Sequence, residues 1–481
     1  MKIRINRFKH FVLFFLGLTL FCFSLTASEK NKEKEDIKVS NEILLIEKFI
    51  EKASKNDTFF DEILINQLTL NYQKDLTLPV RDIVLSVKGQ YEFFLMQNRE
   101  DPSVTVSLSK LFPYTGTDIS ATYKNVPSFS STVSGSELQF LISQPIAENA
   151  FGKSTRLKDK IVGIEIDVIK YQIVEAYEDY LAALISIYYD WYSAYEKMKI
   201  SEMSYKENLK LQDNIYERQK QKIALAVDVN KVELLVLGKK EDLIVLTETF
   251  NTLTNLVAKA VRYSEDVSLI PGDPAYYHVF DLEFEQDYEK FIQQSRTYDI
   301  LRLLENKSSL EVKKNADDLM PSTNLLIGYK VDGDEWKIRN DDNLFYAGIS
   351  VDWPFPDQVE KAEYEVSRIE YKKTKLSNQN KYLELYTNLK NIYLEINREK
   401  ELIIIVDKKL RLSTDILKDE AENYSFGKIT LNDYIAAVNL VDQVKFSKIS
   451  HIVQLKKYLV EWKRLTDQLI DKTSLNLDLE I

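Results

Sequence analysis

The sequence has few of the residues on which enzyme and metal chemistry depends, because its 481 residues include one cysteine and three histidines. Cys22 lies in an N-terminal apolar run, so the rest of the chain has no disulfide framework, thiolate zinc site or cysteine nucleophile. Neither His278 nor His451 has a metal-ligand spacing such as HExxH. The GxSxG, P-loop and GxGxxG motifs are also missing. We therefore expect no catalytic, cofactor-binding or metal-binding residues, and a protein that is not an enzyme.

Glycine, proline and excess positive charge are scarce as well. With 12 Gly and 10 Pro, the chain favours long regular elements over many turns. The 64 basic residues are outnumbered by 75 acidic ones, which gives a formal net charge of −11. This balance disfavours binding to nucleic acid, because phosphate backbones require clustered basic charge. Aromatic residues are abundant, with 28 Tyr and 23 Phe.

Residues 1–27 have the pattern of a secretory signal peptide. A basic start is followed by an apolar stretch from Phe11 to Leu25 and by the small residue Ala27 at the expected cleavage point. Two alternatives remain open: a retained membrane anchor, or a lipoprotein acylated at Cys22, although the bulky Phe21 precedes that cysteine. No later window offers 18 uninterrupted apolar residues, so the exported protein is either soluble or crosses a membrane as strands.

Residues 28–40 are expected to be a charged, disordered lead-in. After it, the same order of short helices, strands and a helical hairpin occurs twice. The first repeat covers residues 41–265 and the second covers 275–470, followed by a C-terminal tail over 471–481. In the first repeat we expect short helices at about 41–55 and 58–72, strands within 104–146, and a helical hairpin at about 156–261. In the second we expect short helices at about 284–294 and 299–314, strands within 324–354, and a hairpin at about 359–470.

These assignments depend on hydrophobic periodicity. From Phe345 to Trp353 apolar residues alternate with Tyr, Gly, Ser and Asp, and about nine such residues can cross a bilayer as a tilted strand. The helices at about 156–221 and 359–423 contain almost no glycine or proline and would each be about 95 Å long. Along residues 431–470 apolar side chains recur at steps of three and four, which is typical of a coiled-coil seam. An ordinary helix-bundle core would give the same seam.

This layout resembles the TolC family of outer-membrane efflux ducts over essentially the whole mature chain. The sharpest match is Tyr-Ser-Phe-Gly-Lys-Ile-Thr-Leu-Asn-Asp at residues 424–433, which is similar to the family's motif at a hairpin tip. Its counterpart at residues 222–229 keeps Asp228 but has Lys222 where the family usually has Gly. The strand ends at residues 141–146 and 349–355, each with a Pro, resemble the family's transition from barrel to helix.

The resemblance implies an α + β membrane protein with two internal repeats. Three copies, each giving four strands, would form a 12-stranded β-barrel that continues into a long α-helical coiled-coil barrel. Four strands alone cannot close a barrel, and lipid tolerates no open sheet edge. Aromatic girdles are expected at the two faces of the membrane. The candidates are Tyr114, Tyr123, Phe140, Phe345, Tyr346 and Trp353.

The implied function is a passive exit duct of a tripartite efflux or type I secretion system. The barrel would lie in outer-membrane lipid and the helical stalk in the periplasm. The expected partners are two further copies of the chain, a periplasmic adaptor, and an inner-membrane pump or ABC exporter. The alternatives are a soluble periplasmic coiled-coil adaptor or structural export component, a surface adhesin, and an exported enzyme. The exported substrate is not readable from the sequence.

The site residues implied by the resemblance lie at the two hairpin tips. Asp433 would contribute to an acidic ring at the periplasmic gate, or would simply be an acidic residue favoured at a helix N-terminus. Asp228 and Tyr424 match positions of a latch that holds the tip closed. The latch arginine of the family maps to Ile429 and its second ring position to Ala436, so neither of these is present. Residues expected to contact the adaptor are Lys222, Ile223, Ala224, Leu225, Gly427, Lys428, Ile429 and Thr430.

Overall fold

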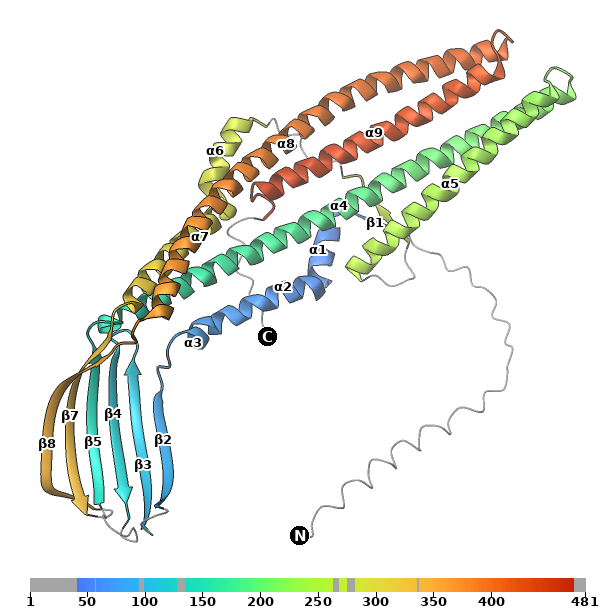
Figure 1. The fold of residues 1–481 in the computed structure, drawn as a ribbon. Coiled ribbons are helices and arrows are strands. Elements are labelled where there is room, and N and C mark those ends of the chain that lie inside the picture. Colours follow the sequence, from blue (N-terminus) through green and yellow to red (C-terminus); the bar gives the residue numbers. More distant parts are fainter. Residues whose placement is uncertain are drawn as a thin grey trace, which may run out of the picture.

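The structure is a computed structural model and describes residues 41–56, 58–94, 99–127, 135–262, 268–274, 282–334 and 337–470. The expected signal peptide, lead-in and C-terminal tail lie outside the described residues, as does His278. The described part is elongated, with a sheet at one end and the tips of two helical hairpins at the other (Figure 1).

Long helices dominate the fold. The two longest, α4 and α8, have 68 residues each, which corresponds to about 100 Å. They form because runs without proline, and with glycine only at Gly163, let each backbone N–H beyond the first turn bond to the carbonyl four residues before it. The helices are α1 (Ile46–Asn56), α2 (Thr58–Thr69), α3 (Gln73–Thr77), α4 (Lys153–Lys220), α5 (Ala226–Val261), α6 (Phe284–Gln294), α7 (Arg296–Asp318), α8 (Gln358–Ser425) and α9 (Leu431–Leu465). No helix among the described residues is long and apolar enough to cross a membrane.

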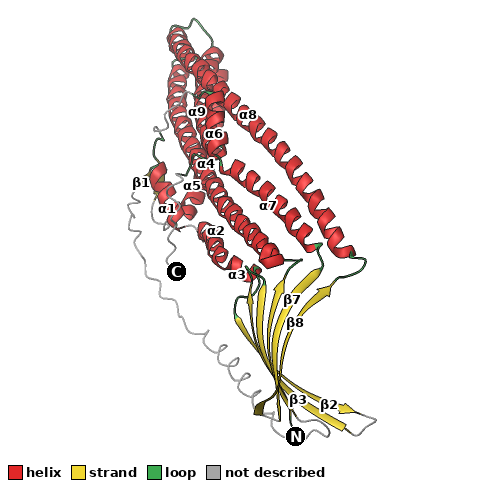
Figure 2. Ribbon diagram, turned by 90° about the vertical axis from the view of Figure 1, so that its left-hand side faces the viewer, coloured by secondary structure: helices red, strands yellow, loops and turns green. Residues whose placement is uncertain are grey.

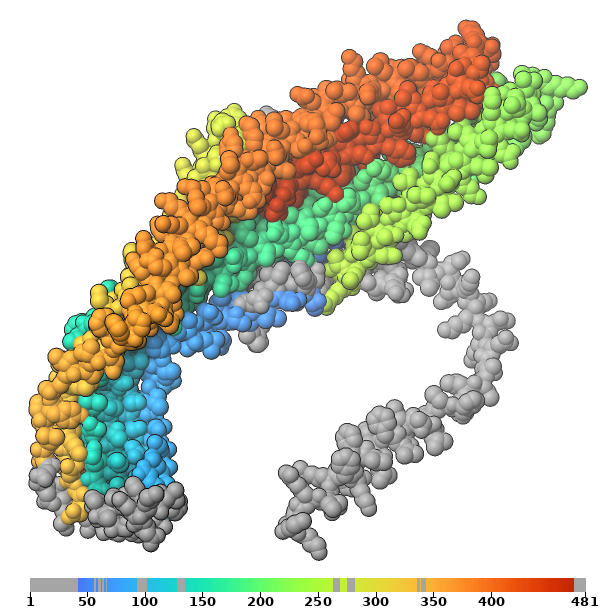
Figure 3. Space-filling model, in the orientation of Figure 1, coloured from blue at the N-terminus to red at the C-terminus, as the bar shows by residue number. Residues whose placement is uncertain are grey.

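The hairpins α4–α5 and α8–α9 pack into one continuous stalk (Figure 3). Near the middle, Trp191 and Tyr188 of α4 are fully buried, and the Trp191 indole donates to Thr254 Oγ1 of α5 at 2.8 Å. The Tyr188 hydroxyl donates to the backbone oxygens of Leu44 and Gly272, at 2.8 and 3.0 Å. This core therefore fastens the segments at the start and at the end of the first half to the long helix α4.

Ion pairs join α4 of the first hairpin to α9 of the second. Lys457 Nζ lies 2.6 Å from Asp190 Oδ1, and Arg464 donates to Asp179 at 2.5 Å. Exposed pairs contribute little stability each, so most of the stabilisation comes from the buried apolar seam between the helices.

The main sheet has six antiparallel strands in the order β2-β3-β4-β5-β7-β8, which Figure 1 labels side by side. Figure 2 shows the strands of this sheet extending beyond the ends of the helices. A separate parallel pair consists of a strand that precedes α1 and a strand that follows α5, so it joins the start of the first half to its end. The strands are β1 (Asn41–Leu44), β2 (Ile83–Phe94), β3 (Arg99–Phe112), β4 (Thr117–Val126), β5 (Gly135–Pro145), β6 (Ser268–Pro271), β7 (Ser322–Asp334) and β8 (Lys337–Asp352), with β1 paired to β6.

The expectation of four strands per chain is wrong, because one sheet contains six. Two strands account for the difference. The expected strand interrupted at residues 113–116 is in fact two strands, β3 and β4, and β2 was not expected at all, although its residues alternate from Leu85 to Glu92 with Gly89 at one of the apolar positions. The alternation in β2 indicates a strand, but less clearly than an unbroken apolar series does. The expected count of four strands came from the resemblance alone. The first half contributes four strands to the sheet and the second half two. The two halves therefore share a long helical hairpin, with a 68-residue helix in each, but differ in the sheet.

Candidate functional site

The predicted site residues gather at the two hairpin turns, at the end of the stalk farthest from the sheet (Figure 1). The first turn joins α4 to α5 and contains residues 221–225; the second joins α8 to α9 and contains residues 426–430. The two turns are far apart in sequence, but side chains from both hairpins pack together just below them. The tips therefore form one candidate site.

At the second tip, Gly427 has a φ of +70°, a conformation that residues with a Cβ rarely adopt. Its N–H donates to Tyr424 O at 3.0 Å, and the N–H of Lys428 donates to Asn423 O at 2.9 Å, which ends α8. α9 then begins with a reciprocal cap. The Asp433 carboxylate accepts from the N–H and the hydroxyl of Thr430, at 3.1 and 2.7 Å, while the Asp433 N–H donates to Thr430 Oγ1.

The hydrogen bonds from Thr430 lower the pKa of the Asp433 carboxyl, so this exposed side chain is ionised at neutral pH. The structure thus shows Asp433 as part of the cap at the N-terminus of α9. A capped carboxylate is still a fixed negative charge, so the cap and an acidic ring are compatible.

At the first tip, Lys222 takes the left-handed conformation with a φ of +61°, at the position where a glycine was expected from the resemblance. Asp228 caps α5 by accepting from the Leu225 N–H at 3.3 Å. Ile223 and Leu225 project outward, each 68% exposed. Exposed large apolar side chains at a loop tip are typical of contact sites for other proteins.

Arg218 links the two hairpins, and the sequence reasoning missed it. The residue lies in the last turn of α4, yet its guanidinium sits 5.1 Å from the ring centroid of Tyr424 at the end of α8. On α9, Tyr434 stacks against Tyr424 with ring centroids 5.6 Å apart and planes 5° from parallel. Burial raises the pKa of the Tyr424 hydroxyl, the Arg218 charge opposes this, and the Asp228 charge adds to it. A guanidinium thus reaches Tyr424 from α4 of the first hairpin, whereas the latch arginine of the family maps to Ile429 in the turn of the second hairpin.

An apolar cluster supports the tips. Ile215 of α4, Val229 and Val232 of α5 and Leu431 of α9 are buried together. The amphipathic pattern could indicate that each helix has an apolar face, but only the packing shows that three of these faces meet beneath the turns.

The sheet has one apolar face and one polar face. Because cross-strand partners point to the same side, the strand registers assign each residue to a face. The apolar face is exposed over much of its area and contains Leu85 and Val87 of β2, Val106 and Leu108 of β3, Ile119 and Tyr123 of β4, Phe140 and Ile142 of β5, Ile327 and Tyr329 of β7, and Phe345 and Ile349 of β8. An apolar patch spread over six strands is too large for an ordinary water-exposed surface.

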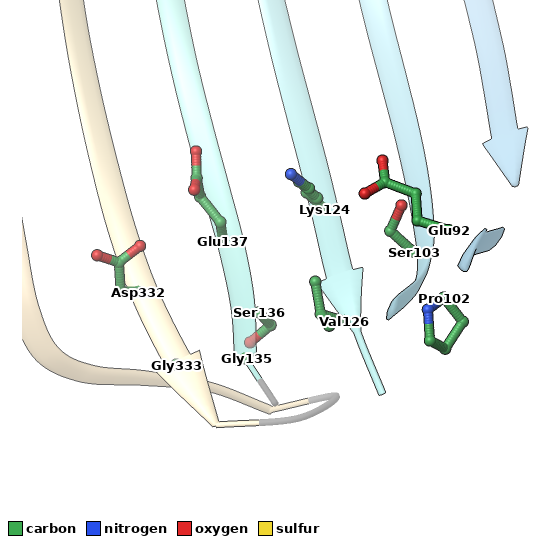
Figure 4. A pocket seen from close by; sticks show the side chains of 10 residues that line it. All are labelled: Glu92, Pro102, Ser103, Lys124, Val126, Gly135, Ser136, Glu137, Asp332 and Gly333. Atoms are coloured by element: carbon green, nitrogen blue, oxygen red, sulfur yellow. The ribbon is translucent and has the colours of Figure 1, made fainter. Parts of the chain in front are cut away.

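The opposite face consists mainly of Ser, Thr, Lys, Gln and Glu, with Leu141 and Leu344 among the exceptions. At its end away from the helices this face is hollowed by a pocket of about 370 Å³ (Figure 4). Glu137 and Lys124 of neighbouring strands line it, so the sheet curves toward its polar side. Among the predicted girdle aromatics, Tyr123, Phe140 and Phe345 lie on the apolar face. Tyr346 does not, because its hydroxyl accepts from Gln139 Nε2 on the polar face.

One cluster of carboxylates in the stalk has the spacing of a metal site. Ligand atoms of Glu175, Glu178 and Asp467 lie within 4.8 Å of one another. Arg296 already occupies their centre: its Nε is 3.2 Å from Glu175, its Nη2 contacts Glu178, and its backbone N–H donates to Asp467 at 2.7 Å. Burial, followed by the Asp467 charge, raises the pKa of Glu175 to about 7. The arrangement is an ion-pair network that joins α4, the start of α7 and the end of the α9 segment.

No family model and no curated protein matches the sequence. The structure, however, is similar to solved structures of outer-membrane channels. It matches CusC, whose structures concern transmembrane channel formation, with a TM-score of 0.70 and 10% identity, covering 88% of this chain and 91% of that one. The outer-membrane channel OprN matches with a TM-score of 0.68 and 11% identity, covering 88% and 89%.

The outer membrane protein VceC of Vibrio cholerae matches with a TM-score of 0.66 and 10% identity, covering 88% of this chain and 95% of that one. The chain therefore has the fold of these outer-membrane proteins over nearly its whole described length. At identities this low the likeness extends to the fold, and it confirms at that level the resemblance to TolC-like ducts.

Proposed function

We propose that the protein is an exit duct of an efflux or secretion system, with its sheet in the outer membrane and its helical stalk in the periplasm. The observation that carries this proposal is the two-faced sheet at the end of the stalk. Its exposed apolar face suits contact with lipid chains, and its hollowed polar face suits a water-filled lumen. The strands have 10 to 16 residues, enough for the roughly 9–11 that a tilted strand needs to cross a bilayer.

A single chain cannot be the complete duct. Its sheet ends at two strands, β2 and β8, that each have one neighbour among the described residues. Open edges expose unpaired backbone groups, which the hydrocarbon region does not tolerate. Several copies must then close the wall, and we propose a homotrimer, in which the two hairpins of each copy also complete a helical tube below the sheet.

The hairpin tips are proposed as the periplasmic gate. Three copies of Asp433 around a threefold axis would concentrate negative charge at the entrance and attract cations. The contact of Arg218 with Tyr424 holds the two hairpins of one copy together. Opening the entrance would require that contact to break or rearrange.

The exposed ends of both tips are proposed to contact a periplasmic adaptor. Ile223 and Leu225 of the first tip and Phe426 of the second are large, apolar and exposed. The adaptor would in turn connect the duct to an inner-membrane pump or ABC exporter, because no nucleotide-binding motif in this chain could supply energy.

Electron microscopy of the purified mature protein in lipid nanodiscs tests this function. We expect a threefold particle with the sheet region inside the disc and a stalk of about 100 Å outside it. A protein that stays out of the disc and remains monodisperse without detergent would refute the duct. It would support instead a soluble periplasmic adaptor or structural export component.

A further inference from the structure

The strands β2 and β3 belong to the same wall as the other four. β2 pairs with β3 over 12 residue pairs and β3 pairs with β4 over nine, without a register shift. The separation of faces also continues: Val87, Val106 and Tyr123 follow one another on the apolar face. Ser86, Ser107 and Thr122 do the same on the polar face. A hairpin that lay apart from the membrane wall would have no reason to share this pattern.

The turn between β3 and β4 is fixed to the junction of sheet and stalk. Gly116 has a φ of +69°, and a Cβ there would lie 2.6 Å from Pro145 Cγ at the end of β5. Gln144 Nε2 donates to Thr115 O at 2.8 Å, and Arg156 of α4 donates to Tyr114 O at 2.6 Å. These contacts therefore fix the ends of β3 and β4 next to the end of β5, at the junction of sheet and stalk.

The two edge strands are suited to pair with each other in different copies. Six antiparallel strands place β2 and β8 in opposite directions, so a rotated second copy presents its β2 antiparallel to β8 of the first. Both edges also carry their apolar residues on the same face, with Leu85 and Val87 on β2 and Phe345 and Ile349 on β8. Such pairing keeps the apolar face continuous across the boundary between copies.

We propose that β2 of each copy pairs with β8 of the next, so that every copy contributes six strands and three copies form an 18-stranded wall. The inference rests on the proposed duct function, from which the number of copies is taken. With strands about 4.8 Å apart and tilted by about 40°, 18 strands enclose a ring about 36 Å across, against about 24 Å for 12 strands. The duct would be wider at the membrane than a 12-stranded barrel.

Disulfide cross-linking tests which strand forms the seam. The full-length protein with Cys22→Ser contains no native thiol, because Cys22 is its single cysteine. One series adds Val87→Cys on β2, and the matched control series adds Ala121→Cys on β4; both residues lie on the apolar face. Each is combined in turn with a cysteine on the apolar face of β8, at Phe345, Ala347, Ile349 or Val351.

After oxidation in membranes, we expect at least one member of the Val87 series to give covalent products of up to three chains on a denaturing gel. The Ala121 series should stay monomeric, because β4 lies inside the sheet. Products from the Ala121 series would overturn the proposal and make β4 the edge of a four-stranded contribution. An absence of products from the Val87 series would overturn it as well, and products that stop at two chains would overturn the count of 18.

The nanodisc images separate the failure of this inference from the failure of the duct. A threefold particle inside the disc together with β4–β8 cross-links would refute the six-stranded seam alone. A particle outside the disc would refute the duct function on which the inference rests.

Discussion

Replacement of Arg218 by Gln should favour opening of the proposed gate at the hairpin tips. The guanidinium lies 5.1 Å from the Tyr424 ring and joins α4 to α8, so its loss removes a contact between the two hairpins. Cation–π contacts are worth about 0.5–1 kcal/mol at exposed sites and about 2 kcal/mol when desolvated. With about 1 kcal/mol in each of three copies, the opening equilibrium would shift by about 3 kcal/mol, or on the order of 100-fold, if the contacts act independently.

Single-channel recording in planar bilayers measures this shift as an increase in open probability. Arg368→Gln is the matched control, because Arg368 lies 5.7 Å from the ring of Tyr364 on the same helix. It removes a similar contact without joining two hairpins, so open probability should stay at the wild-type level. Arg218→Lys should give an intermediate result. If Arg218→Gln and Arg368→Gln behave alike, the reasoning that Arg218 holds the tip closed is wrong.

Three further predictions concern the gate, the stalk and the sheet. Asp433→Asn should raise conductance and weaken block by multivalent cations, because the ionised carboxylate would supply the charge of the proposed ring; bilayer recording checks both. Glu175→Gln should stabilise the protein by roughly 1–3 kcal/mol at pH 8 but not at pH 4, as measured by denaturant unfolding. Gly116→Ala should destabilise the protein by about 1–3 kcal/mol, because the residue has a positive φ and its Cβ would meet Pro145. Gly89→Ala, where no atom lies within 4 Å of the added Cβ, should have little effect on the same unfolding curve.

The pH dependence at Glu175 has a definite sign. Burial raises its pKa in the folded state from 4.5 to about 7, so between these values the unfolded chain loses the proton before the folded chain does. Stability therefore falls as pH rises through that window, and the loss is complete above it. Gln cannot ionise, so the variant should escape the loss. A variant that is equally destabilised at both pH values would show that the ion pair with Arg296 matters more than the surplus negative charge.

An unchanged conductance and cation block in Asp433→Asn would count against an acidic ring. Loss of the helix cap is separable from loss of the ring, because Thr430→Ala removes the hydroxyl that bonds Asp433 while leaving its charge in place. We expect Thr430→Ala to retain cation block, so equal loss of block in both variants would point to the cap as the cause.

Local features of the fold followed from the sequence alone. Helix formation depends on contacts four residues apart, so runs without proline predicted α4 and α8 to within a few residues of their observed ends. The helix end at Gly427 and the place of Asp433 at a helix N-terminus are equally local, whereas the reciprocal cap between Thr430 and Asp433 was seen only in the structure. The order of strands and helices then sufficed for a resemblance that the fold bears out.

Features that join distant segments were decided only by the tertiary structure. The sequence could not place Arg218 against Tyr424, because that contact depends on how two hairpins dock along their apolar seams. Likewise, the alternation in β2 is visible in the sequence, but its membership of the wall depends on pairing with β3 and on the shared faces of six strands. The physical reason is that strand pairing and helix docking satisfy backbone bonds and apolar surface between segments, whereas a helix satisfies its backbone within itself.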